Sequence, residues 1–231
     1  MATRNKLVIS CMDRRLNKIL DKENDGNTIM LRNAGANANG LYGSIKRAIE
    51  NDVSTIKLMA HSDCGAMKVV YNSIKEGAEA SEEIDSTLIS QFEGKQFSTR
   101  NELESLNEAL QTEELEKISN GVEIEKSFVD LSKYTFNEPK EHVAAFVHPS
   151  SEKYEEICKK AGLGVDDTYF IQAESIEEVY ADLEIAITKL GIKRIAAIAM
   201  MPSEYRAMHA EVQKLKMKEF AKSAEVSLIK L

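Results

Sequence analysis

Cysteine, proline and long hydrophobic runs are all scarce in this chain of 231 residues. Its three cysteines, Cys11, Cys64 and Cys158, are a small and odd number, which does not suit the disulfide framework of a small secreted domain and indicates a reducing, cytoplasmic setting. The longest apolar run, residues 195–201, has seven residues, against the roughly 20 that cross a bilayer. We therefore expect no membrane-spanning segment.

The chain also lacks a block of basic residues: 30 Lys and Arg stand against 38 Asp and Glu, and the net charge is -8. Because nucleic-acid binding depends on neutralising phosphates, this balance argues against a nucleic-acid partner. The acidity is local, since residues 75–130 contain 15 acidic and 5 basic residues. Within them Leu103, Leu106 and Leu110 follow helical spacing. We predict that residues 73–140 form an acidic, mainly helical insertion, which is either a solvated cover over part of the core or a lid or partner surface.

What the sequence does contain is a regular alternation of short β-rich runs and amphipathic stretches, with no visible internal repeat and no Gly/Ser-rich linker. This alternation predicts a single α/β domain over residues 1–231, with a mostly parallel β-sheet flanked by helices. The expected strands are Leu7–Ser10, Thr28–Leu31, Thr55–Ala60, Val143–Val147, Thr168–Gln172, Arg194–Met200 and Val226–Ile229. The expected helices are Gly40–Asn51, Ala66–Ile74, Ser151–Lys160, Ser175–Leu190 and Ser203–Lys222.

Polar and metal-binding residues follow each of the first three expected strands. In an open parallel sheet the loops at the carboxyl ends of the strands meet at one edge, so these residues are expected to lie together. Cys11, His61 and Cys64 are the candidate metal ligands, because two thiolates and an imidazole suit Zn²⁺ and three protein ligands leave a fourth position for catalysis. The three segments read Cys11-Met12-Asp13-Arg14-Arg15, Arg32-Asn33-Ala34-Gly35 and His61-Ser62-Asp63-Cys64-Gly65.

One residue separates Asp13 from Arg15, just past the end of a predicted strand, so their side chains can form an ion pair easily. A carboxylate held by a guanidinium stays ionised and accepts a hydrogen bond from a metal-bound hydroxide in a fixed direction. Simpler interpretations stay open at this point. A cysteine at the end of a buried strand is commonly a core residue. In an oxidising setting Cys11 and Cys64 would form a disulfide. Asp13 and Arg15 would then be a surface ion pair, which is worth at most about 1 kcal/mol.

Together these segments resemble the β-class carbonic anhydrases, whose motifs are Cys-x-Asp-x-Arg after one strand and His-x-x-Cys after another. The resemblance covers about residues 5–72. The acidic insertion and the second half do not match the family, and its late glycine-rich hairpin is absent. The resemblance implies a parallel α/β fold and a homodimer or higher homo-oligomer, in which a neighbouring subunit lines part of the pocket.

The same resemblance implies a zinc-dependent lyase, a carbonic anhydrase that hydrates CO₂ reversibly to bicarbonate by zinc-bound hydroxide. One Zn²⁺ per chain would be held by Cys11, His61 and Cys64. Asp13, held by Arg15, would act as a gate, and in some members of the family this aspartate swings onto the metal as a fourth ligand.

Asn33, Gly35 and Gly65 are predicted to shape the substrate pocket, whereas His148 and His209 are interpreted as surface or packing histidines. Two alternatives keep the zinc site: a hydrolase of carbonyl sulfide or carbon disulfide, and a catalytically inactive zinc-binding or regulatory homologue. A nucleotide-binding α/β protein ranks last, because neither Gly-x-Gly-x-x-Gly nor Gly-x-x-x-x-Gly-Lys-Ser/Thr is present.

Overall fold

The computed structural model describes residues 5–231, and its centre is one sheet of eight strands. The strands are β1 (Asn5–Cys11), β2 (Thr28–Asn33), β3 (Val53–His61), β4 (Glu123–Val129), β5 (Val143–Val147), β6 (Thr168–Gln172), β7 (Arg194–Ala199) and β8 (Glu225–Lys230). They lie in the order β4-β3-β1-β2-β6-β5-β7-β8. Within the described residues all neighbours are parallel except β2 and β6 in the middle, which are antiparallel. The predicted mostly parallel α/β sheet is confirmed.

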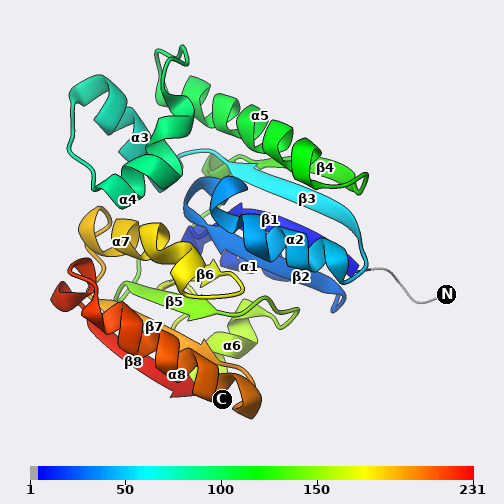
Figure 1. Ribbon diagram of the computed structural model, residues 1–231, viewed down its shortest axis with the longest axis vertical. Helices are drawn as coiled ribbons and strands as arrows, with labels where there is room; N and C mark the ends of the chain where they lie inside the picture. Colours follow the sequence, from blue (N-terminus) through cyan, green and yellow to red (C-terminus); the bar gives the residue numbers. More distant parts are fainter. Residues whose placement is uncertain (1–4) are drawn as a thin grey trace.

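Helices flank this sheet (Figure 1). They are α1 (Asn17–Glu23), α2 (Tyr42–Glu50), α3 (Gly65–Glu76), α4 (Glu82–Ile84), α5 (Arg100–Ile118), α6 (Tyr154–Ala161), α7 (Tyr180–Thr188) and α8 (Pro202–Met217). The long helix α5 packs against α3, β3 and β4, and α4 contacts α7. In the part of the chain that the structure describes, no helix has the length and apolar character needed to cross a membrane.

The inner strands are apolar because both of their faces are covered. All five residues of β5 are buried, and so are residues 195–199 of β7. Continuous apolar runs of this kind are typical of parallel strands between two layers of helices. The edge strand β4 instead exposes Glu123, Glu125 and Lys126, and such charges discourage pairing with the edge of another chain.

Each of the seven strands expected from the sequence overlaps an observed strand, but α1 and β4 were not anticipated. The segment 73–140, predicted as a mainly helical insertion, contains α4 and α5 and also β4, so it is not helical throughout. The charged side chains of β4 interrupt the apolar pattern by which the inner strands were recognised. A strand at the sheet edge needs no such pattern, because one side of it faces solvent.

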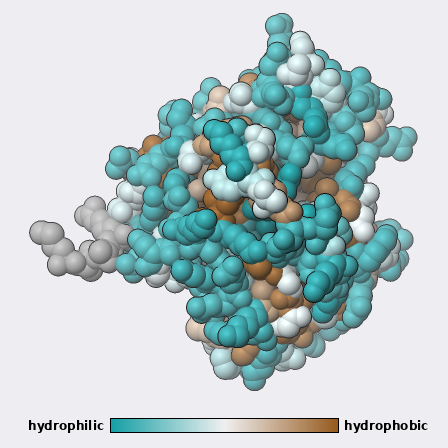
Figure 2. Space-filling model, turned by 180° about the vertical axis from the view of Figure 1, so that it is seen from behind, coloured by the Kyte–Doolittle hydropathy of each residue, from teal (hydrophilic) through white to brown (hydrophobic). Residues whose placement is uncertain are grey.

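The apolar material of the chain is concentrated inside the molecule. On the face shown in Figure 2, hydrophilic residues predominate and hydrophobic residues are visible mainly in recesses between them. The large hydrophobic side chains that are exposed among the described residues are Tyr42, Phe128, Tyr134, Met201, Tyr205 and Met217. Tyr205 and Met217 both lie on α8 and Met201 directly precedes this helix, whereas Tyr42 lies on α2 and Phe128 on β4.

Candidate metal centre

The loops after β1, β2 and β3 meet because these strands are parallel neighbours in the sheet. Cys11 is the last residue of β1, His61 is the last residue of β3, and Cys64 immediately precedes α3. Asp63 has a positive φ of 53°, which turns the chain sharply from strand to helix. The ligand atoms of the two cysteines and the histidine lie within 4.8 Å of one another. The structure therefore brings the three predicted ligands together.

The chemistry of these side chains fits a zinc ion. His61 Nδ1 lies 2.9 Å from the carbonyl oxygen of Ser62 and donates to it, while the buried Nε2 has no hydrogen-bond partner among residues 5–231. An imidazole held in this way presents its Nε2 lone pair to a metal. The Cys11 and Cys64 sulfurs lie 3.8 Å apart, far beyond the about 2.05 Å of a disulfide. That spacing suits two thiolates that each lie about 2.3 Å from a shared tetrahedral ion.

Close contact and burial shift the protonation equilibria of this group. The hydrogen bond from Cys64 holds the pKa of the Cys11 thiol well below its usual value, against the effect of burial. The same contact, together with burial, raises the pKa of the Cys64 thiol well above its usual value. Burial works to lower the pKa of His61, but the charges of Cys11 and Asp13 and the hydrogen bond to the Ser62 carbonyl help to outweigh burial and raise that pKa. Because a divalent cation favours deprotonated thiols, metal binding would release protons from this group.

The loop after β2 supports Cys11 from the side. Gly35 donates its backbone N–H to Cys11 Sγ at 3.4 Å and has a positive φ of 75°, which glycine adopts without strain. The amide side chain of Asn33 closes this loop through two hydrogen bonds with the backbone of Asn37, at 2.8 and 2.9 Å. An N–H donor stabilises a thiolate and fixes its direction. Asn33 and Gly35 therefore shape the loop under the first ligand, and neither residue lines the pocket beside it.

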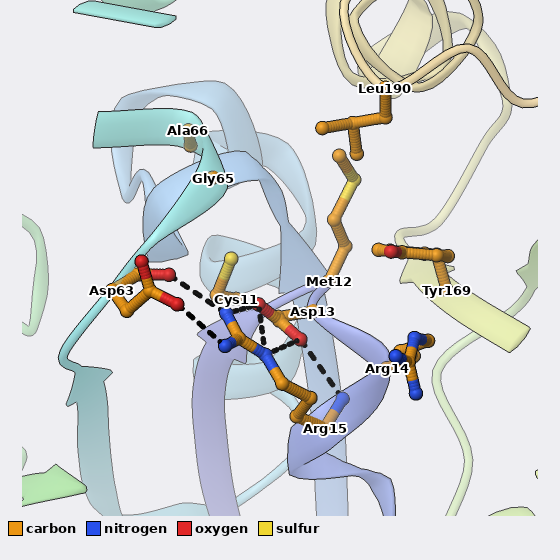
Figure 3. A pocket seen from close by; sticks show the side chains of 10 residues that line it. All are labelled: Cys11, Met12, Asp13, Arg14, Arg15, Asp63, Gly65, Ala66, Tyr169 and Leu190. Atoms are coloured by element: carbon orange, nitrogen blue, oxygen red, sulfur yellow. Dashed lines mark hydrogen bonds and ion pairs between the residues drawn. The ribbon is translucent and has the colours of Figure 1, made fainter. Parts of the chain in front are cut away.

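Asp13 and Arg15 form the ion pair that their spacing predicts. Arg15 Nη2 lies 2.7 Å from Asp13 Oδ2, and the Nε and backbone N–H of Arg15 lie 3.0 and 2.9 Å from Oδ1. Asp63 holds the far side of the guanidinium with its carboxylate at 2.7 Å and its carbonyl at 2.8 Å (Figure 3). Burial works to raise the pKa of Asp13, but the hydrogen bonds and charge of Arg15 help to bring it below its usual value. Asp13 is thus an ionised, oriented carboxylate that lies outside the three-ligand group.

Helix α5 of the acidic segment holds the loops of the site from behind. Glu104 accepts the backbone N–H of Cys64 at 2.9 Å, and Asn107 donates to the carbonyl oxygen of Gly35 at 2.8 Å. One turn further on, Gln111 accepts a backbone N–H from the loop that follows Gly35, at 2.8 Å. These three side chains are buried and share one face of the helix. None of the three was predicted from the sequence, although polar residues at helical spacing next to Leu103, Leu106 and Leu110 were a usable signal.

A pocket of about 270 Å³ lies next to the three-ligand group, and Cys11 is part of its lining. Asp13, Arg15 and the predicted Gly65 also line it. Two further lining residues come from the second half of the chain: Tyr169 on β6 and Leu190 just past α7 (Figure 3). Neither of these two residues was predicted, because no local pattern links them to the motifs.

A second buried carboxylate, Asp182 on α7, supports the loop after β2 from the other side. Its Oδ1 accepts the backbone N–H of Ala34 at 2.7 Å, whereas its Oδ2 has no hydrogen-bond partner within the described range 5–231. Burial raises the pKa of Asp182 to about 7. Ionising this group inside the fold is therefore costly, since one oxygen lacks a donor.

We expect the variant Asp182→Asn to be more stable than the wild type at about pH 8, by about 2 kcal/mol. Asparagine keeps an acceptor for the Ala34 N–H and has no charge to desolvate. A carboxyl whose pKa is raised by folding contributes its stability fully below about pH 4, and this contribution is lost as the pH rises through about 7. The advantage of the variant should therefore shrink as the pH falls.

Urea unfolding between about pH 4 and pH 8 measures the free energy of unfolding of the wild type and the variant, with Asp85→Asn at an exposed position as control. The same pH dependence in the wild type and Asp182→Asn would contradict the prediction.

The fold and the site together define an α/β protein with a candidate metal-binding group at the carboxyl edge of a mostly parallel sheet. The model of the carbonic anhydrase family matches residues 6–147, which is more than half of the chain. The chain therefore belongs to the carbonic anhydrase family, and the resemblance to the β-class enzymes is confirmed. The match extends well beyond residues 5–72, where the motifs had placed it, and it includes the whole acidic segment 73–140, which had been expected not to match the family.

Among solved structures, a carbonic anhydrase from Glaciozyma antarctica is similar to this chain, with 18% sequence identity and a TM-score of 0.36. The similar region covers 55% of this chain and 76% of that chain. Seven chains of solved structures match in all. No curated protein matches the chain.

Proposed function

We propose that this chain is a zinc-dependent enzyme that hydrates CO₂ reversibly to bicarbonate and a proton. The observation that carries the proposal is the convergence of buried Cys11, His61 and Cys64 beside the ionised Asp13. Membership of the carbonic anhydrase family supports it. Zinc, when bound by the three ligands, supplies a hydroxide nucleophile near neutral pH, because it lowers the pKa of a coordinated water to about 7.

Asp13 orients the nucleophile. Its carboxylate accepts the hydrogen bond of the attacking O–H group and so directs a lone pair of that oxygen toward the carbon of CO₂. Arg15 binds both oxygens of Asp13, which keeps the carboxylate ionised and prevents it from rotating. Asp63 in turn holds the guanidinium. The acceptor is thus fixed before the substrate arrives, so little reorganisation accompanies the reaction.

The start of α3 favours the negative charge that develops on the substrate oxygens. Gly65 and Ala66 line the pocket and are the first residues of this helix, which has 12 residues. The N–H groups at a helix N-terminus favour an anion, and here the anion is bicarbonate. Tyr169 and Leu190 also line this pocket and limit its volume to about 270 Å³, which suits a small linear substrate.

The identity of the metal as zinc, one ion per chain, and a cytoplasmic location belong to the same proposal. The donor set of two sulfurs and one nitrogen supports zinc. All three cysteines are free and buried, which suits a reducing compartment.

Metal analysis and stopped-flow CO₂ hydration of the wild type and Asp13→Ala test the proposal. We expect about one zinc per chain in both proteins, and a kcat about a hundredfold lower in Asp13→Ala. Zinc should be retained because Asp13 lies outside the ligand group. The fold should also tolerate the change, because Arg15 keeps Asp63 as an ionic partner.

Asp85→Ala, at an exposed position, is the matched control and should hydrate CO₂ at the wild-type rate. Stoichiometric zinc without hydration by the wild type between about pH 7 and 9 would sink the proposal in favour of an inactive zinc-binding homologue. Sulfide release from carbonyl sulfide or carbon disulfide, faster than CO₂ hydration by the same protein, would instead identify the hydrolase.

A further inference from the structure

The sheet consists of two halves with the same order of strands. Outward from the antiparallel junction in the middle, the first half runs β2, β1, β3, β4 and the second half runs β6, β5, β7, β8. The helices have the same arrangement in both halves. Along the chain, α1, α2 and α3 follow β1, β2 and β3, and α6, α7 and α8 follow the matching strands β5, β6 and β7. The two halves lie side by side in Figure 1, blue to green and green to red. Among the labelled helices of the described chain, α4 and α5 alone have no counterpart.

Matching residues pair with each other at the junction. One row of paired residues crosses the whole sheet, and Arg32 and Gln172 are its central pair. A residue that pairs with its own counterpart marks a twofold axis, as at the interface of a symmetric dimer. From the centre outward the row continues through Ser10, Met59 and Ser127 on one side and Val147, Ile198 and Ile229 on the other. The two halves are therefore related by a pseudo-twofold axis between β2 and β6.

Side-chain contacts across the junction also come in matching pairs. Asp182, the third residue of α7, accepts the backbone N–H of Ala34 at 2.7 Å. Ser44, the third residue of α2, accepts the backbone N–H of Glu174 at 2.7 Å. Ala34 and Glu174 each lie two residues beyond the central pair. In addition, α1 contacts its own counterpart α6. Such an exchange of equivalent contacts is the pattern of an isologous interface, here inside one chain.

Each half has a pocket at the carboxyl ends of its strands, and the other half supplies a wall. The metal-site pocket includes Met12 and is walled by Tyr169 of β6. The second pocket, of about 520 Å³, includes Pro149 and is walled by Ile29 of β2. Tyr169 and Ile29 are each the second residue of their strands, so they hold matching positions. In both halves, therefore, the pocket at the strand ends is closed by a residue at the same strand position of the other half.

The second pocket does not have the donors of the first. His148 stands where Cys11 stands in the first half, and Met200 stands where His61 stands. His148 lies 3.8 Å from the carboxylate of Glu204. Within residues 5–231, the Cys-His-Cys group is the only set of three such donors that lies together. The pseudo-symmetry is therefore broken where the metal chemistry would occur.

We infer that the second half, residues 142–231, takes the place of a partner subunit, closing the metal-site pocket with Tyr169 and Leu190 so that one chain holds one complete site without a second copy. The pairing of β6 with β2 occupies the strand edge that the first half would otherwise offer to another chain. The inference rests on the metal centre of the proposed function and not on its reaction. The homodimer implied by the family resemblance stays a prediction, and this inference leads to a different one, a monomer.

Sedimentation of the full chain, loaded with Co²⁺ as a spectroscopic substitute for zinc, tests the inference. We expect a monomer of 25.8 kDa with one Co²⁺ per chain. The absorption bands of a tetrahedral site should not change over about a hundredfold dilution. Loss of these bands when a dimer dissociates on dilution would overturn the inference, and so would two Co²⁺ ions per chain.

The wall formed by Tyr169 is tested by Tyr169→Ala, with Ile29→Ala as the same truncation at the matching position of the other half. Thiocyanate titration of the Co²⁺ bands is the readout. We expect Tyr169→Ala to weaken thiocyanate binding by about tenfold, because water enters the pocket once the ring is gone. Ile29→Ala should keep the wild-type affinity, and so should Tyr169→Phe, which retains the ring. Wild-type thiocyanate affinity in Tyr169→Ala would overturn the inference.

The two proposals fail separately. A monomer with one Co²⁺ and the expected Tyr169→Ala effect supports this inference even if the zinc-loaded protein does not hydrate CO₂, a result that contradicts the proposed reaction alone. Conversely, an active zinc enzyme whose site assembles only in a dimer contradicts this inference and leaves the reaction standing.

Discussion

The variant Cys11→Ser is expected to bind zinc at least about a thousandfold more weakly than the wild type, and to lose CO₂ hydration with it. Cys11 supplies one of the three donors, and its sulfur is buried at the end of β1. A serine hydroxyl is a much poorer zinc ligand than a thiolate, because it does not ionise readily. His61 and Cys64 alone leave the ion with two protein donors, which is too few for a stable tetrahedral site.

Cys158→Ser is the matched control for this variant. Cys158 is as deeply buried as Cys11 but lies on α6, where its sulfur contacts the Thr168 hydroxyl at 3.8 Å. Competition with a chromophoric chelator gives the zinc affinities, and Cys158→Ser should retain that of the wild type. Since a ligand that binds only the native state raises stability, a chelator should lower Tm for the wild type and Cys158→Ser but not for Cys11→Ser. Tight zinc binding by Cys11→Ser would place the metal elsewhere.

The buried part of the sheet was predictable because parallel strands between helices carry continuous apolar runs. The predicted bounds of Val143–Val147 and Thr168–Gln172 agree with β5 and β6. The edge strand β4 escaped prediction because its charged side chains break that pattern. The likeness of the two halves was invisible for another reason. Matching positions share burial and not residue type, as the fully buried Ser10 and Val147 show.

The core of the site was predictable because spacing along the chain places its residues at neighbouring strand ends. Asp13 follows Cys11 by two residues, so the two lie close together whatever the rest of the chain does. The residues that support the site are not close to the motifs in the sequence. Glu104, Asp182 and Tyr169 reach the site from α5, α7 and β6, so the tertiary fold alone determines their positions. For Glu104 the helical spacing on α5 was a local signal, but no local pattern marks Asp182 or Tyr169, whose roles depend on contacts with residues far along the chain.

Replacing Arg32 by methionine is expected to destabilise the fold by about 3 to 5 kcal/mol and to weaken zinc binding. The side chain is fully buried. Its guanidinium donates to the carbonyl oxygens of Cys11 and Asp13, at 2.9 and 2.8 Å, and to Asn17 Oδ1 at 2.6 Å. Methionine removes the cost of burying a charge, but it takes the side-chain donor away from three buried acceptors, at about 1 to 3 kcal/mol for each acceptor left without a partner. The carbonyl oxygen of Asp13 keeps the backbone N–H of Leu16 at 3.0 Å, so its loss is smaller. The lost hydrogen bonds still outweigh the removed cost of burying the charge, and two of them hold the loop that presents Cys11 and Asp13.

Gln172 offers a matched control, because it is the partner of Arg32 in the central pair and is also buried. It accepts a hydrogen bond from the Tyr154 hydroxyl, so Gln172→Met should cost about 1 kcal/mol and leave zinc affinity unchanged. Urea unfolding with and without zinc, together with chelator competition, measures both quantities for both variants. Equal losses of stability, with wild-type zinc affinity in each, would show that Arg32 packs the centre of the sheet without supporting the metal loop. A larger loss for Arg32→Met, accompanied by weaker zinc binding, would show that the residue at the pseudo-twofold axis holds the ligand loop in place.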